Sequence, residues 1–108
     1  MANAKPEFVV RLDLNNPVFQ SNLLQLQKVE RHAALDTLNK LRQLYWNQVY
    51  RDDGLKWAKI SSVKPPVGVD AIYCLRTTQS RRATAYRDGG FIRLLAIAPD
   101  HDSTYGRK

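Results

Sequence analysis

The sequence has few of the residues on which several large classes of protein depend. Its 108 residues include one cysteine, Cys74, and two histidines. A single cysteine excludes an intrachain disulfide and a cysteine-based zinc site, and it is typical of a reducing compartment. No apolar run approaches the roughly 20 residues of a membrane-spanning helix. The first residues, which include Lys5 and Glu7, also lack the apolar core of a signal peptide. We therefore expect a cytoplasmic protein that does not act at membranes.

Motifs that hold nucleotides or metals are also missing. The five glycines form neither GxxxxGK nor GxGxxG, the loops that hold nucleotide phosphates, and no GxSxG element of a serine hydrolase is present. The histidines, His32 and His101, are far apart and belong to no HExxH motif. We expect His32 to be a solvated helix residue. The sequence therefore predicts neither a cofactor nor a bound metal.

Positive charge is plentiful and unevenly distributed. The net charge is +7, and residues 1–54 contribute little of it, with seven Lys and Arg against six Asp and Glu. Residues 55–108 carry ten Lys and Arg against four Asp and Glu. This asymmetry favours a polyanionic partner for the second half, although a generally basic surface that keeps the protein soluble would have the same composition.

The first half of the chain predicts a strand followed by two helices. Phe8–Leu14 is rich in β-forming residues. Asn16 is a good helix cap, and Pro17 suits the first helical position, so a first helix is expected after them. A second helix over Val29–Tyr45 has apolar residues at helical spacing. The two helices should form a hairpin with one apolar face.

The second half predicts short strands. Residues 46–54 form a connection, and strands are expected over 55–63, 71–77, 82–87 and 91–98, the last of them a central strand. Asp88-Gly89-Gly90 is a typical hairpin turn. The predicted fold is a single α+β domain over residues 1–108, in which the helical hairpin packs on one face of a mostly antiparallel sheet of four to five strands.

The clustered cations, one imidazole and several phenols fit metal-free RNA cleavage, in which a 2′-hydroxyl attacks the neighbouring phosphate. Arg76 and Arg82 are candidates to hold that phosphate, because a guanidinium can bind two of its oxygens. His101 and Tyr105 are candidates for proton transfer. The alternatives are that the arginines are solvated strand-edge residues and that His101 and Tyr105 cap the sheet edge.

Residues 72–105, IYCLRTTQSRRATAYRDGGFIRLLAIAPDHDSTY, resemble the C-terminal sheet of the RelE/ParE superfamily of bacterial toxins. The shared pattern is a strand ending in arginine (Leu75-Arg76), a strand of the form R-x-x-x-Y (residues 82–86), an apolar strand (residues 92–98), and a histidine and tyrosine beyond it (His101 and Tyr105). The predicted helical hairpin and the segment Gly54-Leu55-Lys56-Trp57 follow the same order of elements.

The resemblance implies a type II toxin that cleaves mRNA in the ribosomal A site. It implies a cognate antitoxin that covers the basic face, so that a monomeric free toxin becomes part of a hetero-oligomer. By position, Arg76, Arg82, Tyr105 and, more loosely, His101 match the family's catalytic residues. Lys56 and Lys59 match lysines that bind RNA or assist catalysis, and two further cations of the basic half, Arg81 and Arg93, are added as RNA-binding candidates.

Two other functions remain open at this point. A ParE-like protein would inhibit DNA gyrase without cleaving RNA and would not depend on Tyr105. A non-catalytic RNA-binding module would use the basic sheet, with Tyr73 and Tyr86 as candidates for base stacking. Trp46 and Trp57 are expected in the core, because rings of that size bury a large surface.

Overall fold

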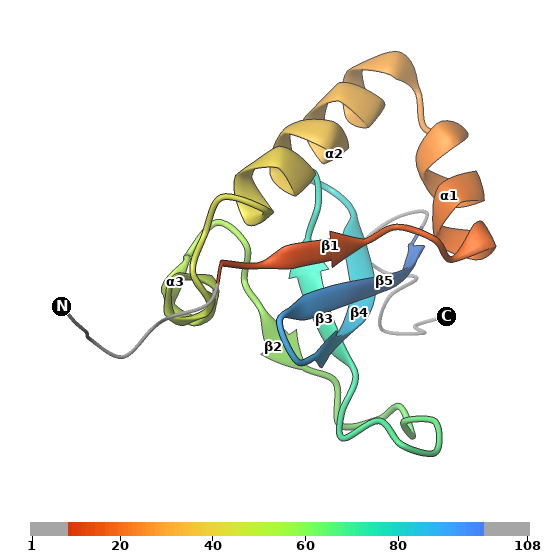
Figure 1. The fold of residues 1–108 in the computed structure, drawn as a ribbon. Coiled ribbons are helices and arrows are strands. Elements are labelled where there is room, and N and C mark those ends of the chain that lie inside the picture. Colours follow the sequence, from red (N-terminus) through yellow and green to blue (C-terminus); the bar gives the residue numbers. More distant parts are fainter. Residues whose placement is uncertain (1–8, 99–108) are drawn as a thin grey trace, which may run out of the picture.

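The computed structural model describes residues 9–98, which form three helices and one five-stranded sheet (Figure 1). The predicted α+β class is confirmed. In chain order the elements are β1 (Arg11–Asp13), α1 (Pro17–Leu24), α2 (Lys28–Leu41), α3 (Trp46–Arg51), β2 (Ala58–Lys59), β3 (Tyr73–Arg76), β4 (Arg82–Asp88) and β5 (Phe91–Ile97). Two of the candidate catalytic residues, His101 and Tyr105, lie outside the described residues.

The sheet is mixed, with the strand order β1-β5-β4-β3-β2. The three pairs β5-β4, β4-β3 and β3-β2 are antiparallel, whereas β1 runs parallel to β5, with Leu12 opposite Ile92. The predicted sheet was mostly antiparallel, and the parallel pair makes it mixed, because the two helices return the chain so that its first strand joins the last. As its apolar sequence predicts, β5 is an interior strand.

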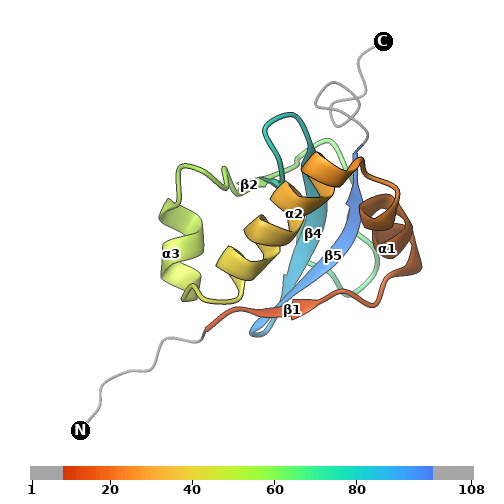
Figure 2. The same ribbon diagram turned by 90° about the horizontal axis from the view of Figure 1, so that it is seen from above.

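The helices form where their caps and apolar stripes predict. The Asn16 side chain accepts hydrogen bonds from the backbone N–H groups of Val18 and Phe19, and Pro17 occupies the first turn. In Figure 2, α2 crosses one face of the sheet, and α1 packs beside β5. Both helices bury apolar residues against the same face of the sheet; the core includes Phe19, Leu38, Leu41, Leu75, Ala83, Ala85, Ile92 and Leu94.

Two segments differ from their predicted form. The expected connection over 46–54 contains α3, where the Gln48 side-chain oxygen accepts a hydrogen bond from the Tyr45 N–H at 2.8 Å and Trp46 is buried. The strand expected over 55–63 is reduced to β2. There Lys56 has a φ of 51°, which interrupts extended backbone, and Leu55 turns into the core.

Candidate phosphate-binding site

Two of the predicted arginines lie opposite each other in the sheet. Arg76 is the last residue of β3, Arg82 is the first of β4, and the two are cross-strand partners. Their neighbours Leu75 and Ala83, also cross-strand partners, belong to the core under the helices. Because side chains alternate along a strand, both arginines lie on the sheet face that is turned away from that core.

This pairing of like charges is unfavourable unless something compensates for it. Directly opposed like charges destabilise an antiparallel pair. Arg82 contacts the Cys74 sulfur through Nη1 at 3.8 Å. The Arg76 side chain makes no hydrogen bond or ion pair with any residue between 9 and 98. The Arg76 guanidinium can therefore bind an anion that does not come from residues 9–98.

A small hollow lies at the arginine pair. It has a volume of about 50 Å³ and is lined by Arg76, Arg82 and the turn residues Gln79, Ser80 and Arg81. Such a volume holds a few waters or one small anion, and it has no room for a base or a sugar. Its size and its lining therefore suit a single phosphate group.

The turn between the two arginines is fixed to α2. The Thr37 hydroxyl donates a hydrogen bond to the Thr77 carbonyl at 2.8 Å, and the Thr77 N–H donates to the Arg81 carbonyl at 3.0 Å. The Thr78 hydroxyl oxygen accepts hydrogen bonds from the N–H groups of Ser80 and Arg81. Thr77 and Thr78 are the buried polar residues of the described chain. The arginines are therefore held on a rigid turn, as a preorganised site requires.

Two other predicted RNA-binding cations are paired within the protein. Arg81 forms an ion pair with Glu30 of α2, and the Ser80 hydroxyl donates to the same carboxylate at 3.1 Å. Arg93 lies between Asp88, at 2.8 Å, and Asp13. Hydrogen bonds to Asp88 and then to Asp13 raise the pKa of Arg93. These two charges are balanced locally, so they contribute less to the field that an outside polyanion experiences.

The two predicted lysines lie near β2 and are exposed. Lys56 follows Leu55, whose carbonyl accepts a hydrogen bond from the Arg76 N–H at 2.7 Å, but Lys56 itself lines a separate hollow with Asp52, Asp53 and Trp57. Lys59 is the register partner of Tyr73, which places it on the helix-side face of the sheet. The structure thus brings Arg76 and Arg82 together and leaves both lysines outside the hollow that the two arginines line.

The chain leaves the sheet next to Arg82. The Ala98 N–H donates a hydrogen bond to the Arg82 carbonyl at 2.8 Å. Residues 99–108, which contain His101 and Tyr105, follow from this point. The described part of the chain therefore ends beside the arginine pair.

An aromatic cluster beside the core was not predicted. Trp57 stacks on Tyr73 with ring centroids 4.7 Å apart, and Trp46 and Tyr50 contact Trp57 edge-on. Arg87 lies over the Trp46 ring at 4.0 Å and donates to the Tyr50 hydroxyl at 2.8 Å. Trp46 is in the core as expected, and Trp57 packs against the core from a half-buried position. The four rings come from α3, from the segment before β2 and from β3, so no single local pattern indicates the whole cluster.

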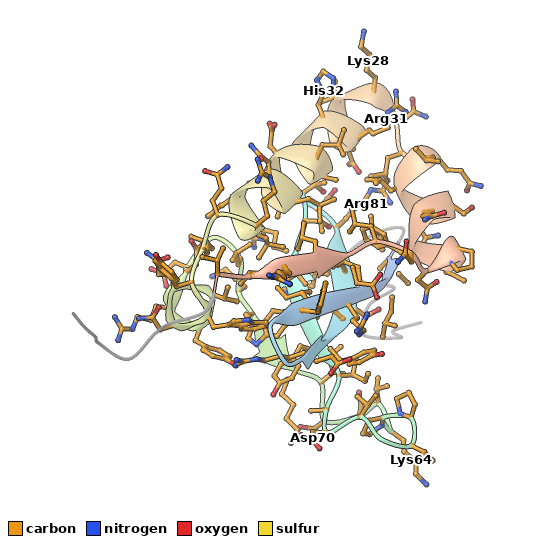
Figure 3. All side chains as sticks on the ribbon, in the orientation of Figure 1. Lys28, Arg31, His32, Lys64, Asp70 and Arg81 are labelled. Atoms are coloured by element: carbon orange, nitrogen blue, oxygen red, sulfur yellow. The ribbon has the colours of Figure 1, made fainter. Side chains whose placement is uncertain are left out.

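Within residues 9–98, no three His, Cys, Asp or Glu side chains lie close enough together to hold a metal ion. No helix in this range is long and apolar enough to cross a membrane. His32 is exposed on α2 and points away from the sheet, as Lys28 does (Figure 3). Comparison of the chain with protein-family models, with curated proteins and with solved structures found no match.

Proposed function

We propose that this protein is a RelE-like toxin, a cytoplasmic, metal-independent endoribonuclease that cleaves mRNA on the ribosome. The observation that carries the proposal is the Arg76 and Arg82 pair, which lies on a fixed turn and lines a hollow of phosphate size. The resemblance of residues 72–105 to the C-terminal sheet of these toxins supports the same function. The proposed partners are mRNA, the ribosome and an acidic cognate antitoxin.

The proposed reaction is an internal transesterification. The 2′-hydroxyl loses its proton to a base and attacks the adjacent phosphorus, and the bond to the 5′-oxygen breaks as that oxygen receives a proton. The products are a 2′,3′-cyclic phosphate and a 5′-hydroxyl. DNA lacks the 2′-hydroxyl and is not a substrate.

The arginines act on the charge of the reacting phosphate. Arg76 and Arg82 stabilise the additional negative charge of the phosphorane, because they approach from two neighbouring strands and stay fixed during the reaction. His101 lies three residues beyond Ala98, a reach of at most roughly 10 Å. We assign the proton transfers to His101 and Tyr105.

The test is in vitro translation with purified protein, with mRNA ends mapped by primer extension. Cleavage that requires translating ribosomes is expected from the wild type and is expected to fall at least a hundredfold in Arg76→Ala and Tyr105→Phe. Lys28→Ala is the matched control, since Lys28 is an exposed cation of α2 that points away from the sheet (Figure 3). Its cleavage should equal that of the wild type.

Intact mRNA in the presence of translating ribosomes would reject the nuclease. A gyrase supercoiling assay with the same preparations then separates the ParE-like alternative, which predicts inhibition by the wild type and by Tyr105→Phe alike. Circular dichroism of each variant establishes that a loss of cleavage does not reflect a loss of fold.

A further inference from the structure

A second, larger hollow shares Arg81 with the phosphate-sized one. It has a volume of about 350 Å³ and lies between α1, the α1–α2 turn and the end of β5. Buried Leu26 and Ile97 supply its apolar wall, and Asn22, Gln25 and Gln27 supply three carboxamides. A volume of this size is at the lower end of small-molecule sites, so it suits one planar ring system.

The polar groups of this hollow are only partly used by the protein. Asn22 accepts a hydrogen bond from the Ile97 N–H at 2.9 Å through Oδ1, which leaves its amide group as a donor. Gln25 donates through Nε2 to the Ser21 hydroxyl at 3.0 Å, which leaves its Oε1 as an acceptor. Gln27 precedes α2 and makes no capping hydrogen bond through its side chain. Donors and acceptors thus surround an apolar wall.

Arg81 joins this hollow to the arginine pair. Its side chain lines both the 350 Å³ hollow and the 50 Å³ hollow. In Figure 3 it lies beneath α2 and beside α1. The Arg81 Nε is committed to Glu30, which fixes the orientation of the guanidinium plane. A fixed guanidinium plane is a surface on which a base can stack.

We propose that the hollow between α1 and the end of β5 binds one nucleobase of the RNA strand, next to the phosphate held by Arg76 and Arg82. Carboxamides that offer a donor and an acceptor read the edges of bases, and apolar and guanidinium surfaces hold their faces. The adjacency matches the covalent structure of RNA, in which each base is joined through its sugar to a phosphate. This inference rests on the proposed function, because it specifies which base determines the position at which the RNA is cleaved.

The first test maps cleavage positions across many mRNAs by sequencing the new 5′ ends. The wild type is expected to favour one base at one position near the cut by about tenfold, the discrimination that one good side-chain contact provides. The double variant Gln25→Ala/Gln27→Ala is expected to lose the cuts at that base selectively, so that the preference falls close to one. Gln43→Ala is the matched control, an exposed glutamine of the segment that follows α2. A preference unchanged in the double variant, or no preference in the wild type, would overturn the inference.

The second test does not depend on cleavage. ¹⁵N-labelled protein is titrated with each of the four nucleoside 3′-monophosphates and with inorganic phosphate. At least one nucleotide is expected to shift the amide resonances of Leu26, Gln27, Ile97 and Ala98, while phosphate alone shifts only those of residues 80–82. The double variant should lose the first set of shifts and keep the second. Such shifts without any mRNA cleavage would support the base site and reject the nuclease, whereas identical shifts with phosphate and with every nucleotide would overturn the base site.

Discussion

Arg76 and Arg82 are direct cross-strand partners, so two guanidinium groups share one end of one face of the sheet. Folding alone does not require this arrangement, because opposed like charges weaken an antiparallel pair. The hydrogen-bonded turn that joins them holds both residues in place. An anion bound at this end of the sheet would meet two guanidinium groups that are already in position.

Anion binding should stabilise the protein through Arg76. Inorganic phosphate is expected to raise the melting temperature of the wild type, because a ligand that binds only the folded state shifts the equilibrium toward it. Arg76→Ala should lose this response. Without phosphate, the free energy of unfolding of the variant should equal that of the wild type or exceed it by about 0.5 kcal/mol. Differential scanning fluorimetry over a phosphate series measures both effects. Arg51→Ala, an exposed arginine of α3, should keep the full response.

Glu30 should stabilise the turn between Arg76 and Arg82. Glu30→Ala removes the ion pair with Arg81 and the hydrogen bond with Ser80, both partly shielded from water. We expect it to lower the free energy of unfolding by about 1–2 kcal/mol. Urea denaturation followed by circular dichroism measures the change. Asp36→Ala, an exposed carboxylate on the same helix, should stay within about 0.5 kcal/mol of the wild type, and an equal loss in both variants would contradict this role.

Stability should fall in acid through Asp13. Its pKa is lowered from 3.8, first by the hydrogen bond from the Asn15 N–H and then by the Arg93 guanidinium. A carboxyl group whose pKa is lower in the folded than in the unfolded state stabilises the fold above the unfolded value. That contribution is lost as the pH falls below 3.8 through the folded pKa.

The test of this acid dependence compares the wild type with Asp13→Asn. The variant should be less stable at pH 7, and its stability should fall less steeply than that of the wild type below pH 3.8. Urea denaturation at a series of pH values measures both. Parallel curves for the two proteins would show that Asp13 does not carry the effect.

Arg87 should stabilise the aromatic cluster through its planar group. Arg87→Lys keeps the charge but loses the stacking on Trp46 and the hydrogen bond to Tyr50, so a loss of about 1–2 kcal/mol is expected. Tryptophan fluorescence during urea denaturation reports it, because Trp46 and Trp57 both lie in the cluster. Arg11→Ala is the control, since Arg11 is exposed and lies 6.0 Å from the Phe91 ring. Its effect should stay below about 0.5 kcal/mol.

Local signals predicted much of the fold. The Asn16 cap, the stripe of α2 and the hairpin turn at Gly89, which has a φ of 61°, each depend on neighbouring residues and lie where the sequence indicates. The second helix ends at Leu41, four residues before its predicted end, because the chain turns there to begin α3. A cap made by Gln48 for Tyr45 has no common sequence signature, so α3 was missed.

The candidate site was harder to predict where it depends on distant partners. The register that places Arg76 opposite Arg82 is set by the short connection between β3 and β4, so the sequence nearly predicts this pairing. Arg81 and Arg93 look like free cations in the sequence, but their partners Glu30 and Asp13 are 51 and 80 residues away. No local pattern carries that information. His101 and Tyr105 lie outside the described residues, so their roles stay predictions.

The parallel pairing of β1 with β5 sets an order for biosynthesis. β1 emerges early from the ribosome, yet its partner strand consists of residues 91–97. Until those residues have left the exit tunnel, β1 has no strand to join and β4 has only one neighbour. The turn that carries Arg76 and Arg82 can form earlier, but the sheet behind it is complete only afterwards. Maturation of the fold should therefore follow synthesis of β5, and the nascent chain should be inactive before that point.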